Sequence, residues 1–332
     1  MTRVILLLSC LLQLSLAFAS DLRIATVQFE SIDGEFDKNL AKVVEYVRVA
    51  KSQGAAITLL PEFALIGYNL SPEIWASAEQ ANGSSRKALA RLAIESEMYI
   101  GTSFLEVEGA QFFNTFILVG PQGGLAGRVR KRVPAGAEGY FFEGYKDHHV
   151  IKTPLGNVGI GICQETYRCF LPKELHNGDA DFVLMPFSYP DLSQAGGLGS
   201  PKGTYIAKWY ADQLGVPIVT SNKTGNWRQV DGAFFPGYSA AVGADGHTLG
   251  ELDASPGVLV VDLILDSSLK TKPSADCIGP FLKELTIGSW LEKRVTWFRI
   301  WIADLFDANP DDEIHDAYLA SEKRQAAAQK LK

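Results

Sequence analysis

The stretch "VGIGICQET" (158–166) places Cys163 where an apolar run ends and polar residues begin. An apolar run of this length predicts a buried strand, and in α/β proteins the carboxyl edge of the sheet is where ligands and catalytic groups gather. A thiol attacks a carbonyl carbon only as the thiolate or with a base beside it. Cys163 is therefore a candidate nucleophile if the fold brings a base to it, and otherwise a buried packing residue.

Histidine is the usual partner of a catalytic thiol, but no histidine in the chain follows a predicted buried strand. Two other ionisable residues lie in or at the end of predicted strands: Glu62 ends "AITLLPE", and Lys131 lies in "GRVRKRV". A carboxylate directly after an apolar run costs free energy unless something requires it there. Taken singly, Glu62 also fits a helix cap and Lys131 an exposed edge strand. The histidines set aside in this way are His148, His149, His176, His247 and His315.

Taken together, the segments around these residues resemble the nitrilase superfamily, the carbon-nitrogen hydrolases, over residues 22–262. The resemblance rests on "LPEFALIGY", "RKRVPAGAEGYFFEG" and "GIGICQET", in that order and at about the family's intervals. Further agreement comes from Asn114 in "FFNTFILVG", the strand "GDADFVLMPFS", Asn222 in "TSNKTG", and "FPGYS" followed by "AAVGADG".

The resemblance implies a role for each residue of the site. Cys163 is the nucleophile, Glu62 the general base, Lys131 the cation that stabilises the oxyanion, and Glu138 the second carboxylate accompanying this triad. The backbone N–H of Gln164 is a second oxyanion donor, although the family often has an aromatic residue at that position. The implied fold is a four-layer α-β-β-α sandwich, and no metal or cofactor is implied. Side chains that could line the pocket, or belong to the core instead, are Tyr68, Tyr140, Tyr167, Phe187 and Trp209.

The expected reaction is hydrolysis of a non-peptide carbon-nitrogen bond of a small molecule. The stretch "KRVPAGAEGYFFEG" looks more like amidase branches than true nitrilases, which favours a carboxamide or N-carbamoyl group over a nitrile. An N-acyltransferase would use the same three residues and pass the acyl group to an amine. A non-catalytic binding protein on the same scaffold is the alternative of another class. It is disfavoured because all three groups are present.

The apolar residues repeatedly switch between strand and helix periods, which predicts helices layered on mixed sheets. Helical spacing of Leu40, Val43, Val44 and Val47 predicts a helix that ends near Gly54. Other helices are expected over 84–97, 172–176 and 204–214. Strands are expected over 22–29, 55–62, 98–104, 112–120, 124–133, 157–163, 181–187, 216–222, 237–246 and 257–265.

The two ends of the 332-residue chain differ from this hydrolase domain, predicted over 21–266. Residues 1–20 have a positive start, an apolar run and an A-x-A pattern, which predicts a secretory signal and hence a secreted or periplasmic protein. The extension 267–332 contains an apolar helix face over 287–306. This face is predicted to pack on the core or across a homodimer interface, or else to contact a membrane surface.

Charge and cysteine content narrow the partners further. The net charge is −7 and the basic residues are scattered, so the sequence lacks the positive surface that nucleic-acid binding needs, and a nucleic-acid partner is not expected. Removal of the signal would discard Cys10 and leave three cysteines, so at least one thiol stays free. A bond between Cys169 and Cys277 would leave Cys163 free, but the sequence does not decide this pairing.

Overall fold

The computed structural model describes residues 20–195 and 199–274. The first of its two large sheets has the strand order β14-β1-β2-β3-β4-β5. Its centre is parallel, because β1 pairs with β2 and β2 with β3 in the same direction, and β14, β4 and β5 add antiparallel pairs at the two sides. Its strands are β1 (Ser20–Gln28), β2 (Ile57–Leu59), β3 (Tyr99–Glu108), β4 (Gln111–Val119), β5 (Leu125–Arg130) and β14 (Gly257–Leu265).

The second sheet has the order β13-β12-β9-β8-β7-β6, with β7, β8 and β9 parallel. β6, β12 and β13 enter it antiparallel to their neighbours. Its strands are β6 (Val150–Thr153), β7 (Gly156–Ile160), β8 (Phe182–Pro186), β9 (Ile218–Ser221), β12 (Ala240–Val242) and β13 (Thr248–Glu251). A separate two-stranded ribbon joins β10 (Thr224–Asn226) to β11 (Phe234–Pro236).

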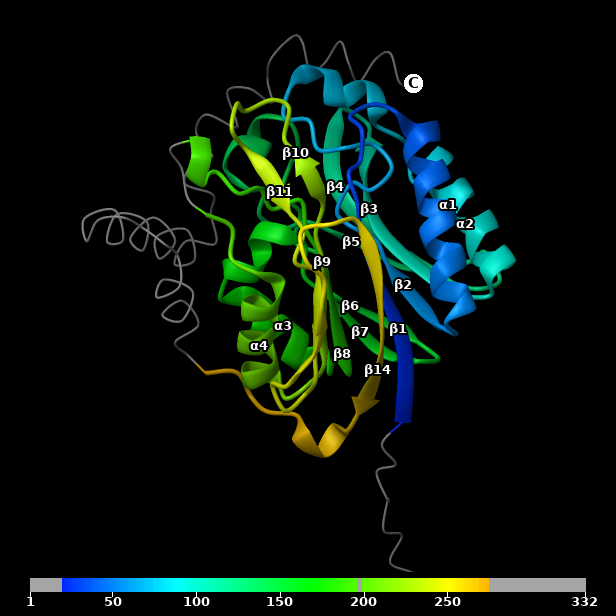
Figure 1. Ribbon diagram of the computed structural model, residues 1–332, viewed down its shortest axis with the longest axis vertical. Helices are drawn as coiled ribbons and strands as arrows, with labels where there is room; N and C mark the ends of the chain where they lie inside the picture. The colour runs from blue at the N-terminus through cyan, green and yellow to red at the C-terminus, as the bar shows by residue number, and fades with distance from the viewer. Residues whose placement is uncertain (1–19, 196–198, 275–332) are drawn as a thin grey trace, which may run out of the picture.

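Helices cover the outer face of each sheet, so the layers follow the order helix, sheet, sheet, helix (Figure 1). α1 (Phe36–Ser52) and α2 (Ser84–Ser96) lie against the first sheet, and α3 (Phe170–Asn177) and α4 (Gly203–Leu214) against the second. The predicted four-layer α-β-β-α sandwich is confirmed. Its sheets meet face to face because each has one face covered by helices and must bury the other.

Strand β1 shows how the sequence builds two cores at once. Leu22 and Ile24 pack in the core that includes the second sheet, whereas Ala25 and Val27 pack in the core beneath α1 and α2. Side chains alternate between the faces of a strand, so one apolar segment serves both layers. The sheets are also joined by a hydrogen bond from Thr26 Oγ1 to the carbonyl of Thr220 at 2.7 Å.

Most predicted elements are present, with bounds that differ at strand ends, and four short strands were not predicted. β2 stops at Leu59, so Glu62 lies three residues beyond it, and β7 stops at Ile160, before Cys163. The prediction missed the short strands β6, β10, β11 and β13, which lack a long apolar run. The predicted signal (1–20, of which only Ser20 is described) and the helix over 287–306 lie outside the described residues. Within the described part of the chain, no helix is both long enough and apolar enough to cross a membrane.

Candidate active site

Glu62 is fully buried just beyond the end of β2, where three donors hold its carboxylate. Oε1 accepts from Asn114 Nδ2 at 2.6 Å and from Lys131 Nζ at 3.0 Å. Oε2 accepts from the backbone N–H of Ser188, the second residue after β8, at 2.8 Å. A buried carboxylate is tolerated when its oxygens are paired in this way. Both sheets therefore contribute to fixing the orientation of this carboxylate.

Lys131 is fully buried directly after β5 and carries its ammonium between two carboxylates. Its Nζ lies 3.0 Å from Glu62 Oε1 and 3.0 and 2.8 Å from the two oxygens of Glu138. Burial alone would lower the pKa of Lys131, but Glu138 and Glu62 outweigh that effect and raise it. The side chain is thus a permanent cation at neutral pH.

Glu138 comes from a 3₁₀ turn (Gly136–Tyr140) and completes this cluster. Besides Lys131, it accepts hydrogen bonds from the hydroxyl of Tyr68 at 2.8 Å and from the backbone N–H of Ala135 at 2.7 Å. Burial and the nearby Glu62 raise the pKa of Glu138, although Lys131 opposes the shift. Two carboxylates share one ammonium, so the cluster carries a net negative charge when all three groups are ionised.

Cys163 opens a 3₁₀ turn (Cys163–Tyr167) after β7, with a left-handed backbone at φ +50° and only 3% of its surface exposed. Such a conformation is strained for a residue with a side chain and persists only where its surroundings hold it. Burial and the Glu62 carboxylate raise the pKa of the thiol well above its usual range, while Lys131 and the N–H of Ser188 oppose this. At neutral pH the resting sulfur is a protonated thiol beside a carboxylate.

Residues 23–272 match the carbon-nitrogen hydrolase family. The chain belongs to this family. In this fold Glu62, the neighbouring Lys131 and Glu138, and Cys163 come together from three separate parts of the sequence. The described residues contain no group of three or more histidine, cysteine, aspartate or glutamate side chains arranged to hold a metal ion.

Relatives of this carbon-nitrogen hydrolase include both nitrilases and amidases. It is 28% identical over 166 residues to an aliphatic nitrilase of Sinorhizobium fredii, a match covering 44% of this chain and 53% of that protein. It is 30% identical over 179 residues to omega-amidase NIT2-B of Xenopus laevis, covering 50% of this chain and 63% of that one. The chain thus spans between half and two thirds of the length of these two relatives.

A solved amidase from Nesterenkonia sp. AN1 superposes with a TM-score of 0.64 at 25% identity, over 74% of this chain and 94% of that one. That structure shows the result of Michael addition of acrylamide at the active-site cysteine of a variant. A carbon-nitrogen hydrolase from Helicobacter pylori has a TM-score of 0.67 at 16% identity, which speaks for the fold.

The side chains expected to line a pocket have different environments. Tyr68 touches the cluster through Glu138, and Tyr167 is buried against Tyr189 with ring centroids 5.8 Å apart. Phe187 is a core residue, but its carbonyl accepts from the N–H of Glu62 at 3.3 Å. Tyr140 is half-buried against the core under α1 and α2, and Trp209 is buried in α4. The half-buried Gln164 lies in the Cys163 turn, and its role as an oxyanion donor stays a prediction.

Sequence reasoning gave no role to two residues that hold Glu62. Ser188 follows the buried strand β8 as Cys163 follows β7, so the same positional signal was present. Asn114 is a buried amide within β4, where an uncompensated polar group would be costly. Cys163 is a free thiol and Cys169 is disulfide-bonded. Cys10 and Cys277 lie outside the described residues.

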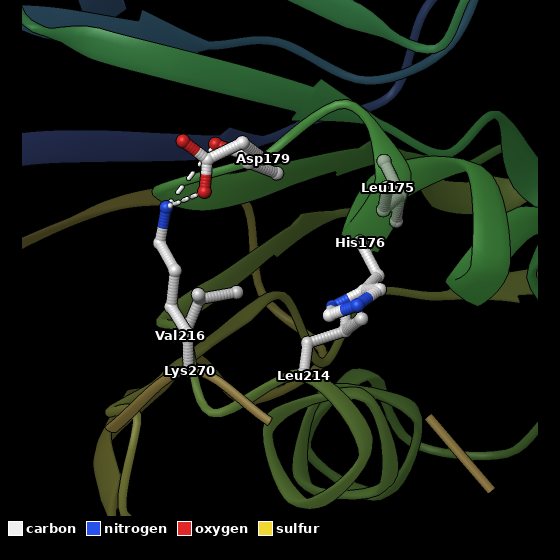
Figure 2. A pocket seen from close by; sticks show the side chains of 7 residues that line it. Leu175, His176, Asp179, Leu214, Val216 and Lys270 are labelled. Atoms are coloured by element: carbon white, nitrogen blue, oxygen red, sulfur yellow. Dashed lines mark hydrogen bonds and ion pairs between the residues drawn. The ribbon is translucent and has the colours of Figure 1, made fainter. Parts of the chain in front are cut away.

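A separate hollow of about 110 Å³ lies at the amino ends of β8 and β9 in the second sheet, among residues that precede these strands. Figure 2 shows Lys270 reaching Asp179 there, and the ammonium also contacts Asp181 at 2.7 Å. Apolar residues, among them Leu175 and Leu214, line the rest. The hollow lies before β8 and β9, whereas Glu62, Ser188 and Cys163 follow the ends of their strands, so it is separate from the cluster of Glu62, Lys131, Glu138 and Cys163.

Proposed function

We propose that the protein hydrolyses a carboxamide or N-carbamoyl group of a small molecule through a thioester on Cys163. The observation that carries this proposal is the placement of the Lys131 ammonium between Glu62 and Glu138, beside a buried thiol in a strained turn. Amide carbon is a poor electrophile, and its hydrolysis needs a nucleophile, a proton carrier and a cation where negative charge develops. This cluster contains one of each.

In the acylation step, the Cys163 sulfur attacks the carbonyl carbon and its proton passes to Glu62. The developing oxyanion is stabilised by Lys131 and the backbone N–H of Gln164. Glu62 then delivers the proton to the nitrogen as the carbon-nitrogen bond breaks, releasing ammonia or an amine and leaving a thioester. The raised thiol pKa supports proton transfer during the attack over a preformed thiolate.

In the deacylation step, Glu62 removes a proton from water as the water oxygen attacks the thioester carbon. The carbon-sulfur bond breaks, the carboxylic acid leaves, and the proton returns to the sulfur. Glu138 supports this step by holding Lys131 and orienting the water, and Tyr68 fixes Glu138 in turn. The active site therefore returns to its starting protonation state.

An amide substrate is favoured over a nitrile. The related amidase from Nesterenkonia sp. AN1 has been solved in complex with butyramide. The nitrilase names among the relatives make nitrile hydrolysis the second candidate. A panel of aliphatic amides, N-carbamoyl compounds and nitriles, assayed for ammonia release, would separate the two. Analysis of the products with and without an added amine would distinguish hydrolysis from the N-acyl transfer that the same residues could perform.

We further propose that the protein is a secreted or periplasmic homodimer. The signal pattern in 1–20 supports export, and so does the disulfide at Cys169, since disulfides persist in oxidising compartments. Light scattering and the mass of the mature N-terminus test these two statements. Liposome flotation of the full chain against a form ending at residue 266 tests whether the apolar face over 287–306 binds membranes or serves protein packing.

The first experiment on the mechanism is Cys163→Ala. The residue is small and buried, so the variant is expected to fold with an unchanged circular dichroism spectrum. Ammonia release from every amide that the wild type hydrolyses should fall to background, and no acyl adduct should be detected by intact mass. Wild-type turnover by Cys163→Ala would sink the thioester mechanism.

A further inference from the structure

A second charge cluster, with His149 and Glu165 buried and Arg132 and Glu174 half-buried, lies directly beside the catalytic one. It consists of Arg132, His149, Glu165 and Glu174, here called the His149 network. His149 is 1% exposed, and its Nε2 lies 3.2 Å from Glu165 Oε1 while its Nδ1 lies 2.9 Å from Glu174 Oε2. Arg132 Nη1 reaches Glu174 Oε1 at 2.9 Å. Two cations and two carboxylates therefore balance one another.

Glu165 connects this network to the backbone on either side of the active site. Its Oε2 accepts from the N–H of Ile162, the residue before Cys163, at 3.1 Å. Its Oε1 accepts a short hydrogen bond from the N–H of Arg132, the residue after Lys131. One fully buried carboxylate thus joins the main chain next to the nucleophile to the main chain next to the catalytic cation.

His149 supplies the charge that makes a buried Glu165 carboxylate tolerable. Burial alone would lower the pKa of His149, but Glu165 and Glu174 raise it to about 10. Since each ring nitrogen faces a carboxylate oxygen, the imidazolium donates both of its protons. The other groups around the ring are the carbonyl of Asp147 at 3.2 Å and the ring of Phe170. The histidine is a fixed cation at neutral pH.

We propose that Glu165, held in place by His149, is a positioning residue that sets the separation between the Cys163 sulfur and the Lys131 ammonium. The proposal deepens the hydrolase function above and rests on it for the roles of Cys163 and Lys131. Lys131 follows β5 directly, with its N–H bonded to the carbonyl of Asn114 in β4 at 2.8 Å, and Cys163 lies three residues after β7 in the other sheet, so no strand pairing joins these two residues to each other. Cys163 is also held in a strained backbone conformation, which needs an external constraint.

The test uses acrylamide, which alkylates a thiol as the sulfur bonds to the terminal alkene carbon and a proton is taken up at the carbon next to the carbonyl. Intact mass follows the adduct on Cys163 over time. The limiting rate and the half-saturating concentration report reactivity and binding separately. Circular dichroism reports the folded fraction separately, because an unfolded chain also exposes its thiol to acrylamide. A merely structural role of Glu165 would lower the folded fraction and leave the rate of the remaining folded protein unchanged.

Glu165→Gln keeps the shape of the side chain but removes one of its two acceptors. We expect the limiting rate to fall about 100-fold with the half-saturating concentration unchanged, as for a displacement of reacting groups by about 1 Å. The matched control is Glu106→Gln, which breaks an equally buried pair with Arg130 but touches no backbone beside the cluster. Its rate should stay within about twofold of the wild type.

The double variant His149→Gln/Glu165→Gln separates geometry from charge, because it removes one positive and one negative charge together. A rate that stays low supports positioning, whereas recovery of the wild-type rate would mean that the effect was electrostatic and would overturn the proposal. If Glu165→Gln does not fold, His149→Gln decides, with an expected fall of about tenfold. The proposal would also be overturned if Glu165→Gln, or His149→Gln in its place, folds and is alkylated at a limiting rate within twofold of the wild type. If the proposed hydrolase function is wrong, the result is different: acrylamide alkylates Cys163 of the wild-type protein, but that protein releases ammonia from no amide.

Discussion

The catalytic cluster and the His149 network are built from similar parts, yet they suit different tasks. Each places a buried cation between two glutamates: Lys131 between Glu62 and Glu138, and His149 between Glu165 and Glu174. In the network a further cation, Arg132, balances the charges. In the catalytic cluster Lys131 alone forms ion pairs with the two carboxylates among the described residues, and burial and the neighbouring Glu62 raise the pKa of Glu138.

The difference in charge balance explains the difference in use. A balanced buried cluster has no proton that it readily gains or loses, so it is suited to holding a geometry. In the catalytic cluster two carboxylates share one ammonium, and burial together with Glu62 raises the pKa of Glu138, so this cluster is suited to moving a proton between sulfur, water and a leaving nitrogen. The two clusters are also close in sequence, since Arg132 follows Lys131 and Glu165 lies two residues after Cys163. The His149 network can therefore hold the backbone of the catalytic cluster.

The largest expected effect comes from removing one of two adjacent buried cations. Lys131→Met should lower ammonia release about 1000-fold, because it removes the charge that stabilises the oxyanion. Arg130→Met is the matched change, since Arg130 pairs with Glu106 in a site of similar burial. Lys131→Met should lose about 3–5 kcal/mol of unfolding free energy in urea, because it removes the ammonium that both Glu62 and Glu138 contact, whereas Arg130→Met should lose less, because Glu106 keeps its ion pair with Arg128. An activity loss of the same size in Arg130→Met would remove the distinction between catalytic and structural cations.

A smaller effect is expected in the pH dependence of stability. The pKa of His149 is raised from 6.5 to about 10 in the folded protein. Its contribution to stability is therefore complete below pH 6.5 and is lost as the pH rises through about 10. Urea unfolding between pH 6 and 10 should show a loss on the order of 3 kcal/mol in the wild type relative to His149→Gln.

The subtraction of the His149→Gln curve is needed because Lys223 acts in the opposite direction. Burial lowers the pKa of Lys223 to about 7, although Asp33 and Glu62 oppose the shift. The folded protein therefore gives up this proton before the unfolded chain does, and Lys223 makes stability rise with pH over the same interval. Parallel curves for the wild type and His149→Gln would show that His149 carries no charge in the network.

The smallest effect should come from Tyr68→Phe, which removes a single hydrogen bond to Glu138. We expect about a tenfold slower deacylation, seen as a larger steady-state fraction of acyl-enzyme in the mass spectrum, and a loss of about 1 kcal/mol in stability. Tyr46→Phe on α1 makes the same chemical change outside the site and serves as the control. Equal acyl-enzyme fractions in the two variants would rule out a catalytic contribution of the Tyr68 hydroxyl.

Much of the fold was predictable because the signals are local. The apolar runs that became β1, β8 and β14 and the helical spacing that became α1 depend only on neighbouring residues, and these elements lie where they were expected. The short strands β10, β11 and β13 were missed because their pairing partners, and not their own sequence, define them. Within the site, the positions of Glu62 and Cys163 after buried strands carried a usable signal.

His149 has a structural connection to the site that no local sequence signal indicates. His149 was set aside because it follows no buried strand, and in the structure it does not contact the thiol. It acts one step further away, on the carboxylate that holds the backbone beside Cys163. No spacing rule links His149 to Glu165 and Glu174, because they come from a loop, a turn and a helix.

The sequence by itself determined the inventory: a thiol and a carboxylate at strand ends, a lysine nearby, and enough alternating apolar segments for two sheets. Only the tertiary structure decided that Lys131 lies between Glu62 and Glu138, that Tyr68 holds Glu138, and that Glu165 joins the two halves of the site. The physical reason is that side-chain periodicity is a property of a few neighbouring residues. Contacts across 70 residues, as between Tyr68 and Glu138, depend on the order in which strands assemble.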